Sequence, residues 1–154
     1  MGVSGSGKTT IGSLLSTKTG YAFYDADSFH PSENINKMKA GQQLTDLDRL
    51  PWLNNIHTFV LDQIKNHSII IACSALKEAY RKILGRQLEN QCSWVFLKGD
   101  FKTIRNRMEK RTDHFMPVDL LKSQFDILEM PVGSIEVPVT LPPSLIVDFI
   151  ISKI

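Results

Sequence analysis

The sequence has 154 residues, of which 42% are hydrophobic and 22% charged, and its formal net charge is only +2. These values are typical of one soluble globular domain, so we take residues 1–154 as a single domain. The small charge, without a Lys/Arg stripe, argues against nucleic acid, and no apolar run reaches the ~18 residues of a membrane span. We expect a cytoplasmic protein with no membrane or nucleic-acid partner and a small-molecule substrate; a homodimer is compatible with these data.

Short apolar segments alternate with segments of helical periodicity along the chain. In chain order, the patterns predict helix 9–18, strand 21–24, helix 31–41, a polar loop at 41–47, helix 48–64 capped by Asp48, strand 69–73, helix 77–88, strand 94–97, a helix around 104–108, helix 118–128, strand 137–141 and helix 144–154. This alternation predicts a three-layer α/β fold with a parallel sheet and helices on both faces. In such folds the ligands bind beyond the carboxyl ends of the strands.

The first ten residues contain a phosphate-binding motif. Residues 2–9 read GVSGSGKT and match G-x-x-x-x-G-K-[ST] in full. The backbone N–H groups of such a loop and the following helix start bind phosphate oxygens. Lys8 is expected to reach the β- and γ-phosphates, and the Thr9 hydroxyl to ligate Mg²⁺. We therefore predict a site for ATP and Mg²⁺ whose nucleotide-binding residues are Gly2, Ser4, Gly5, Ser6, Gly7, Lys8, Thr9 and Thr10.

Two acidic residues follow the strand predicted at 21–24. Switch and motor ATPases usually end a later apolar strand in a magnesium-binding Asp, but here that strand ends in Cys73-Ser74. Asp25 and Asp27 are the available carboxylates. One of them can hold a Mg²⁺-bound water while the other accepts a proton from an attacking hydroxyl. The alternative interpretation is a solvated turn, where Asp is common.

Further polar residues fit an anionic, hydroxyl-bearing substrate. His30 can donate to a substrate oxygen or cap the helix that begins near Pro31. Arg49 lies in the first turn of a helix, where the helix dipole disfavours a cation, which indicates a ligand. Lys77 and Arg81 are like-charged i,i+4 neighbours whose repulsion a bound anion would relieve.

A group of arginines precedes residues 111–114 (RTDH) and indicates a lid at about 107–118. Such a lid would stabilise charge on the transferring phosphoryl group and exclude water. We expect Arg107 to contact the nucleotide, Arg111 to act in catalysis and His114 to contact the substrate. A solvated helix face is the alternative for some of these arginines, which are Arg105, Arg107 and Arg111.

At this point the sequence resembles the gluconokinase family of P-loop kinases. The resemblance implies an adenylate-kinase-like α/β fold and ATP-dependent conversion of D-gluconate to 6-phosphogluconate. It also implies that Asp27 is the base. The residues implied to face the substrate are His30 and Arg49, in a substrate-binding region of about 25–65, and Arg81 beyond it. Arg107 and Arg111 are implied to belong to the lid. The stretches that carry the resemblance, in family order, are MGVSGSGKTT, FYDADSFHP, LTDLDRLPWL, CSALKEAYR, LKGDF, RNRMEKRTDHFMP and SQFDILE.

One departure from that family lies at the front of the chain. Its members carry an apolar strand before the phosphate-binding loop, whereas here only Met1 precedes Gly2. We therefore expect this first strand to be truncated. A catalytically impaired nucleotide-binding protein is one alternative, although the intact Lys8, Thr9 and acidic pair argue against it. A shikimate-kinase-like enzyme is the other, and residues 74–77 (SALK) argue against it because that family is glycine-rich there.

Overall fold

The structure is a computed structural model that describes residues 1–88, 91–110 and 118–154, with side chains from residue 120 onward in the last range. Its strands are β1 (Ala22–Asp25), β2 (Ile69–Ala72), β3 (Val95–Lys98) and β4 (Ile135–Pro138). Its helices are α1 (Lys8–Thr19), the 3-10 helix η1 (Ala26–Phe29), α2 (Ser32–Lys39), α3 (Asp46–Gln63), α4 (Glu78–Leu84), α5 (Phe101–Glu109), α6 (Val118–Asp126) and α7 (Pro143–Ile151). None of the described helices combines the length and the apolar character that a membrane crossing requires.

All pairings between these strands are parallel. β1 pairs with β2, with Ala22 opposite Ile69, and β3 pairs with β4, with Val95 opposite Ile135. Residues 1 and 2 bridge the two pairs: the Leu97 N–H donates to the Met1 carbonyl at 3.0 Å, and the Gly2 N–H donates to the carbonyl of residue 74 at 3.2 Å. The predicted parallel α/β architecture is therefore confirmed.

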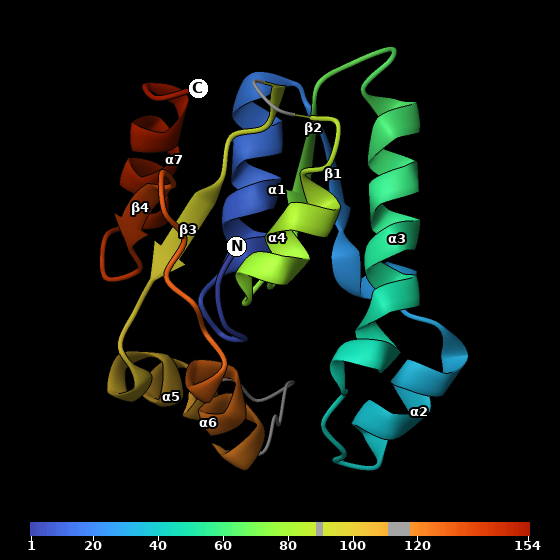
Figure 1. Ribbon diagram of the computed structural model, residues 1–154. Helices are drawn as coiled ribbons and strands as arrows, with labels where there is room; N and C mark the ends of the chain where they lie inside the picture. Colours follow the sequence, from blue (N-terminus) through green and yellow to red (C-terminus); the bar gives the residue numbers. More distant parts are fainter. Residues whose placement is uncertain (89–90, 111–117) are drawn as a thin grey trace.

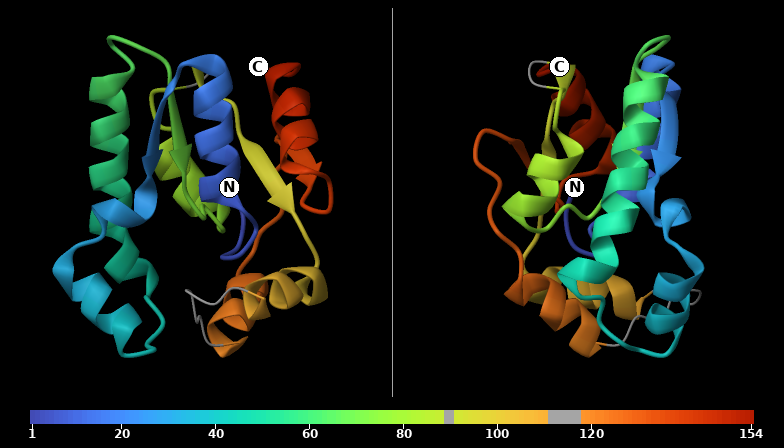
Figure 2. Two further views of the ribbon diagram at one scale, coloured as in Figure 1. Left: turned by 180° about the vertical axis from the view of Figure 1, so that it is seen from behind. Right: turned by 45° about the vertical axis from the view of Figure 1, so that its right-hand side comes forward.

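Helices cover both faces of this strand layer (Figure 1). α1 and α7 pack together on one face and come to the front when the molecule is seen from behind, whereas α4, which packs against α3, then lies at the back (Figure 2). Each face has its own apolar core, one centred on residues such as Leu15 and Val147 and the other on residues such as Trp52 and Leu53. Gly12 lets α1 approach β1 closely, because a Cβ there would lie 2.3 Å from the ring of Phe23.

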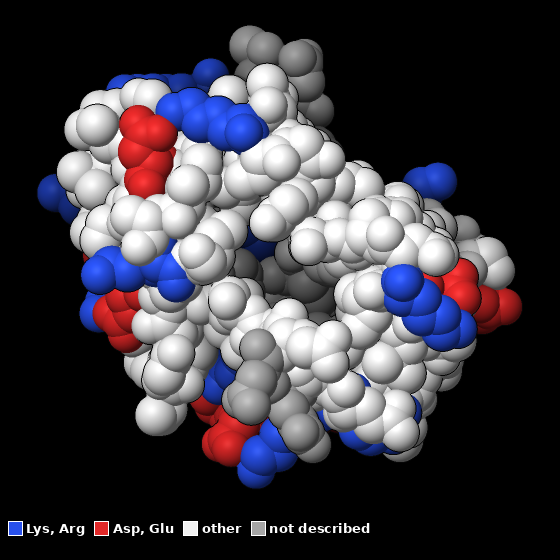
Figure 3. Space-filling model, turned by 90° about the horizontal axis from the view of Figure 1, so that it is seen from above, with Lys and Arg blue, Asp and Glu red and all other residues white. Residues whose placement is uncertain are grey.

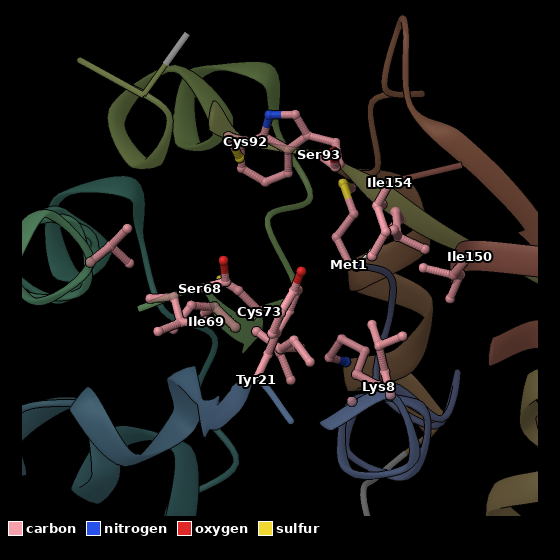
Figure 4. Close-up of a pocket in the computed structure, with 18 of the residues that line it drawn as sticks. Met1, Lys8, Tyr21, Ser68, Ile69, Cys73, Cys92, Ser93, Ile150 and Ile154 are labelled. Atoms are coloured by element: carbon pink, nitrogen blue, oxygen red, sulfur yellow. Dashed lines mark hydrogen bonds between the residues drawn. The ribbon is translucent and has the colours of Figure 1, made fainter. Parts of the chain in front are cut away.

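An apolar cavity of about 380 Å³ separates β2 from β3 above the bridge made by residues 1 and 2. Figure 4 shows Met1, Lys8, Ile150 and Ile154 around part of its wall. Seen from above, the surface is hollowed at its centre, and the rim of the hollow is mostly uncharged (Figure 3). The strand residues that line the cavity are Ile69, Ile70, Ile71, Ala72, Val95 and Leu97.

Among the element boundaries that differ from the prediction, three have a clear local cause. Helix α3 is capped by Thr45 and not by Asp48, because the two residues form a reciprocal capping box that starts the helix at Asp46. The helix predicted at 77–88 ends at Leu84, where the Gly85 N–H closes the last turn onto the Arg81 carbonyl. The last strand is 135–138, since pairing with β3 begins opposite Val95 and a turn follows Pro138.

Candidate active site

The phosphate-binding loop, residues 2–7, runs from the bridge between β2 and β3 into α1. Gly5 and Gly7 have φ values of +78° and +96°, which L side chains rarely adopt. A Cβ on Gly5 would also lie 2.6 Å from Cγ of Met108 on α5. The loop therefore requires glycine at Gly5 both for its backbone conformation and for its contact with α5.

Lys8 lies across this loop. Its ammonium donates to the carbonyl oxygens of Gly2 at 3.1 Å and Val3 at 3.0 Å. Burial lowers the pKa of Lys8 below its ordinary value, and the Asp27 carboxylate partly opposes this shift. The Ser6 hydroxyl is buried and has no hydrogen-bond partner among the described residues. An orphaned buried hydroxyl and a partly desolvated ammonium beside turned backbone amides fit a bound polyphosphate.

Thr9 and Asp25, the two predicted metal ligands, are in direct contact. The Thr9 hydroxyl donates to Oδ2 of Asp25 at 2.8 Å, and Oδ1 of the same carboxylate accepts the Asp27 N–H at 3.1 Å. Within residues 1–88, 91–110 and 118–154, no group of three or more His, Cys, Asp and Glu side chains could hold a metal ion. A Thr–Asp pair fits Mg²⁺, which takes few protein ligands and completes its shell with water and phosphate oxygens.

His30 is held in one orientation beside the acidic turn. Its ring stacks on Trp52 with a centroid distance of 4.2 Å, and the Asn34 amide nitrogen lies 3.4 Å from its Nδ1. That amide nitrogen also donates to the Asp48 carbonyl at 2.8 Å, which orients the Asn34 amide. Because an amide nitrogen only donates, Nδ1 of His30 is the acceptor and Nε2 carries the proton. Burial also lowers the pKa of His30, against the nearby Asp27, so the neutral ring is favoured and presents an N–H donor.

The alternative role of His30 as a helix cap finds no support. Pro31, and not His30, occupies the N-cap position of α2, and no side-chain cap is found there in the part of the chain that the structure describes. Asn34 is buried between His30 and the start of α3, and sequence reasoning missed it as a member of the site, because nothing local in the sequence specifies its contacts to His30 and Asp48. Trp52 is fixed in turn, because its indole N–H donates to the Ala26 carbonyl at 2.7 Å.

The starts of α3 and α4 meet in a cluster of charged and polar side chains that we call the α3–α4 cluster: Asp46, Arg49, Lys77 and Tyr80. The Lys77 ammonium donates to both carboxylate oxygens of Asp46 at 2.8 Å, and the Tyr80 hydroxyl donates to the same carboxylate. Arg49 donates to the Tyr80 hydroxyl at 3.4 Å and to the Leu44 carbonyl. The hydrogen bond to Asp46 raises the pKa of Lys77, and the bonds from Lys77 and then Tyr80 lower the pKa of Asp46.

These contacts correct the predicted repulsion between Lys77 and Arg81. Lys77 precedes α4 and pairs with Asp46, while the Arg81 guanidinium donates to the carbonyls of Ala75 and Leu76 at 3.0 Å each. The two cations therefore have partners within the chain. Sequence reasoning missed Asp46 and Tyr80 as members of this group, because the contacts of Asp46 with Lys77 and with Tyr80 span 31 and 34 residues.

The predicted lid is described only in part. Arg107 donates to the Val139 carbonyl after β4, and Arg105 pairs with Glu109 on an exposed helix face at 2.7 Å. The Arg105 contact agrees with a solvated helix face. Arg111 and His114 lie outside the described residues, so their roles stay predictions. Thr10 is exposed in the first turn of α1, and the Ser4 N–H donates to Oε1 of Gln124 on α6.

Comparison with known proteins identifies the family of this chain. The family model described as shikimate kinase matches residues 4–125. The chain is 48% identical to the thermosensitive gluconokinase of Escherichia coli K12, in an alignment that covers 85% of this chain and 70% of that protein. It is 45% identical to a probable gluconokinase of Rattus norvegicus, covering 85% and 80% of the two chains. The chain belongs to the gluconokinase family.

A solved structure agrees with this assignment. The crystal structure of a gluconokinase from Sinorhizobium meliloti 1021 superposes with a TM-score of 0.87 and is 39% identical, with 99% of this chain and 87% of that chain covered. The predicted resemblance and the P-loop kinase fold are thereby confirmed. The match to the shikimate kinase model is compatible with this assignment, because both names belong to P-loop kinases.

Proposed function

We propose that this gluconokinase-family chain transfers the γ-phosphoryl group of ATP to a hydroxyl of D-gluconate and forms 6-phospho-D-gluconate. Identity of 45–48% to gluconokinases supports this activity. The observation that carries it is the position of Asp27. Its backbone N–H donates to the Asp25 carboxylate, which also accepts the Thr9 hydroxyl, and its negative charge acts to raise the pKa of both Lys8 and His30. A proton acceptor next to a phosphate and metal site suits phosphoryl transfer to an alcohol.

On the nucleotide side, the proposal gives each loop residue a defined task. The backbone N–H groups of Gly5, Gly7 and Thr10, with the Lys8 ammonium, bind the phosphate oxygens, whereas those of Gly2, Ser4 and Ser6 donate within the chain and hold the loop in shape. Thr9 with Asp25 holds Mg²⁺ directly or through water. ATP supplies the phosphoryl group, and Mg²⁺ neutralises part of its charge. Lys8 must exchange its two carbonyl contacts for phosphate oxygens, and the Ser6 hydroxyl gains the partner it lacks among the described residues.

On the acceptor side, Asp27 takes the proton of the attacking hydroxyl and the Nε2–H of His30 holds a neighbouring hydroxyl. The cations of the α3–α4 cluster, together with Arg81, attract the gluconate carboxylate. We further propose that Arg107, Arg111 and His114 act from a lid at about 107–118, where the first two face the nucleotide and its transferring phosphoryl group. Substrate binding thus draws on residues from about 25 to 65 and from the start of α4.

The direct test is a kinase assay of the purified chain. With ATP and Mg²⁺ present, we expect ADP formation that depends on D-gluconate, and mass spectrometry should show a monophosphorylated product. Shikimate and aldonates other than gluconate serve as competing acceptors. Shikimate is the second candidate because the matching family model bears its name and covers residues 4–125. Turnover with shikimate but not gluconate would reverse the assignment, and ATP binding without turnover of any acceptor would indicate an impaired protein.

A further inference from the structure

The helix that follows the predicted lid is tied to the phosphate-binding loop by one side chain. Oε1 of Gln124, on α6, accepts the backbone N–H of Ser4 at 2.7 Å across 120 residues of sequence. Because a backbone N–H only donates, the amide oxygen must face the loop and the amide NH₂ must face away from it. The Ser4 N–H lies between the loop glycines Gly2 and Gly5, so this bond fixes the middle of the loop.

The same stretch of chain reaches the acceptor side of the site. Five residues after Gln124, the Glu129 carboxylate accepts the backbone N–H of Glu78 at 2.5 Å at the start of α4. The Glu129 N–H donates to the Leu76 carbonyl at 2.9 Å. That carbonyl also accepts from Arg81, one of the proposed gluconate-binding cations. Residues 124–129 therefore contact the nucleotide side at one end and the acceptor side at the other.

Apolar packing on both sides of Gln124 holds α6 in place. Leu121, on the same helix, is 1% exposed and belongs to the core that also contains Val3 of the loop. Phe125 stacks edge-on against Phe101 at the start of α5, with a centroid distance of 5.5 Å. The Gln124 side chain thus projects from a helix whose neighbours are packed on both sides, and it is held in a preorganised position.

We propose that Gln124 is a positioning residue for phosphoryl transfer, which fixes the phosphate-binding loop through Ser4 while Glu129 fixes α4 in the same segment. This inference rests on the proposed function. Gln124 acts through the loop, so its loss should weaken nucleotide binding and turnover more than it weakens gluconate binding. Loss of Glu129 should have the opposite selectivity, because its contacts lie at Leu76 and Glu78 beside the gluconate-binding cations.

The test uses Gln124→Leu, which removes the hydrogen-bond acceptor of the Ser4 N–H with little change in side-chain size. We measure the ATP dissociation constant of this variant by calorimetry in the absence of gluconate. We expect it to rise about tenfold, in line with the loss of one partner of a partly buried backbone N–H. The kcat should fall, the gluconate KM should stay within twofold and the Tm should stay close to that of the wild type. Lys122→Leu is the matched control, since Lys122 is exposed on the same helix and pairs with Asp126. Glu129→Ala should raise the gluconate KM with unchanged ATP affinity.

Each result decides the matter. Unchanged ATP affinity and kcat in Gln124→Leu, or a loss of activity that merely follows a lower folded fraction, would overturn the inference. If Gln124→Leu does not fold, Gln124→Asn keeps the amide but shortens its reach by one methylene and should show the same selective loss. The ATP titration needs no acceptor, so it tests Gln124 even if gluconate turns out not to be the substrate.

Discussion

The Thr9 hydroxyl donates to the Asp25 carboxylate at 2.8 Å and so joins the first turn of α1 to the carboxyl end of β1. This bond brings the two proposed metal ligands next to the proposed base, because Asp25 also accepts the Asp27 N–H. The Asp27 carboxylate in turn acts to raise the pKa of Lys8 in the loop. The proposed chemistry therefore depends on residues at the start of α1 and just after β1. Because each proposed role belongs to one side chain, single substitutions can test the roles separately.

Lys8→Ala should abolish phosphoryl transfer while the fold is retained. Lys8 is proposed to neutralise β/γ-phosphate charge that grows in the transition state, whereas its present contacts are two loop carbonyls. Activity is measured with ATP and gluconate, and folding by circular dichroism. Lys18→Ala is the control, because Lys18 is an exposed residue near the end of the same helix and pairs with Asp148 of α7. Activity of Lys8→Ala within tenfold of wild type would show that the role given to this loop is wrong.

Asp27→Asn should lose most turnover and keep ATP binding. The substitution removes a proton acceptor but leaves the backbone N–H that donates to Asp25. The measurement pairs kcat with an ATP titration. If nucleotide affinity collapsed while bound substrate still turned over, Asp27 would belong to the metal site and Asp25 would become the candidate base.

The stability of the protein should fall at acid pH in part through Asp48. Its carboxylate accepts from the Lys37 ammonium at 2.6 Å and from the Thr45 N–H and hydroxyl, and these bonds, led by that from Lys37, lower the pKa of Asp48 to about 2. Because the pKa is lower in the folded state, the stabilisation is present above the ordinary value of 3.8 and is lost as the pH falls through about 2. Thermal melts of Asp48→Asn should show a shallower decline between about pH 4 and 2. An unchanged slope in that window would contradict this role.

The features that the sequence predicts correctly are those whose residues lie close together along the chain. The phosphate-binding loop, the acidic turn and the strand–helix alternation are local patterns, and the structure contains all of them. The cap of α3 is also encoded locally, since residues 45–48 (TDLD) have the capping-box spacing, but the prediction assigns the cap to Asp48, which is the other member of the box.

The contacts that complete the site are encoded differently. The Gln124 bond to Ser4 and the Tyr80 bond to Asp46 join residues 120 and 34 positions apart. No periodicity or motif specifies such pairs, because they arise only when the packing of the apolar cores sets how α6 and α4 approach the loop and α3. Arg49 shows what dipole reasoning leaves out: a cation early in a helix indicates a ligand, but the argument does not identify the intrachain partners that orient the side chain, which are the Leu44 carbonyl and Tyr80.

The last prediction concerns the cavity between β2 and β3. Met1 already pairs there as a strand residue, because its carbonyl accepts the Leu97 N–H and its nitrogen donates to the Val95 carbonyl. An extension of about six apolar, β-branched residues ahead of Met1 should continue this parallel pairing and fill the 380 Å³ space. Burial of about five such side chains at roughly 1.5–3 kcal/mol each is on the order of 10 kcal/mol before the entropy of ordering them, which rivals the ~5–15 kcal/mol net stability of a typical domain. The extended protein should therefore melt at a clearly higher temperature and phosphorylate gluconate faster, because Gly2 and the loop are then anchored from both sides.

An extension of equal length made of Gly and Ser is the control, since it adds chain without apolar side chains. Equal melting temperatures and equal activities for the chain and its apolar extension would refute the idea that this cavity accepts a strand.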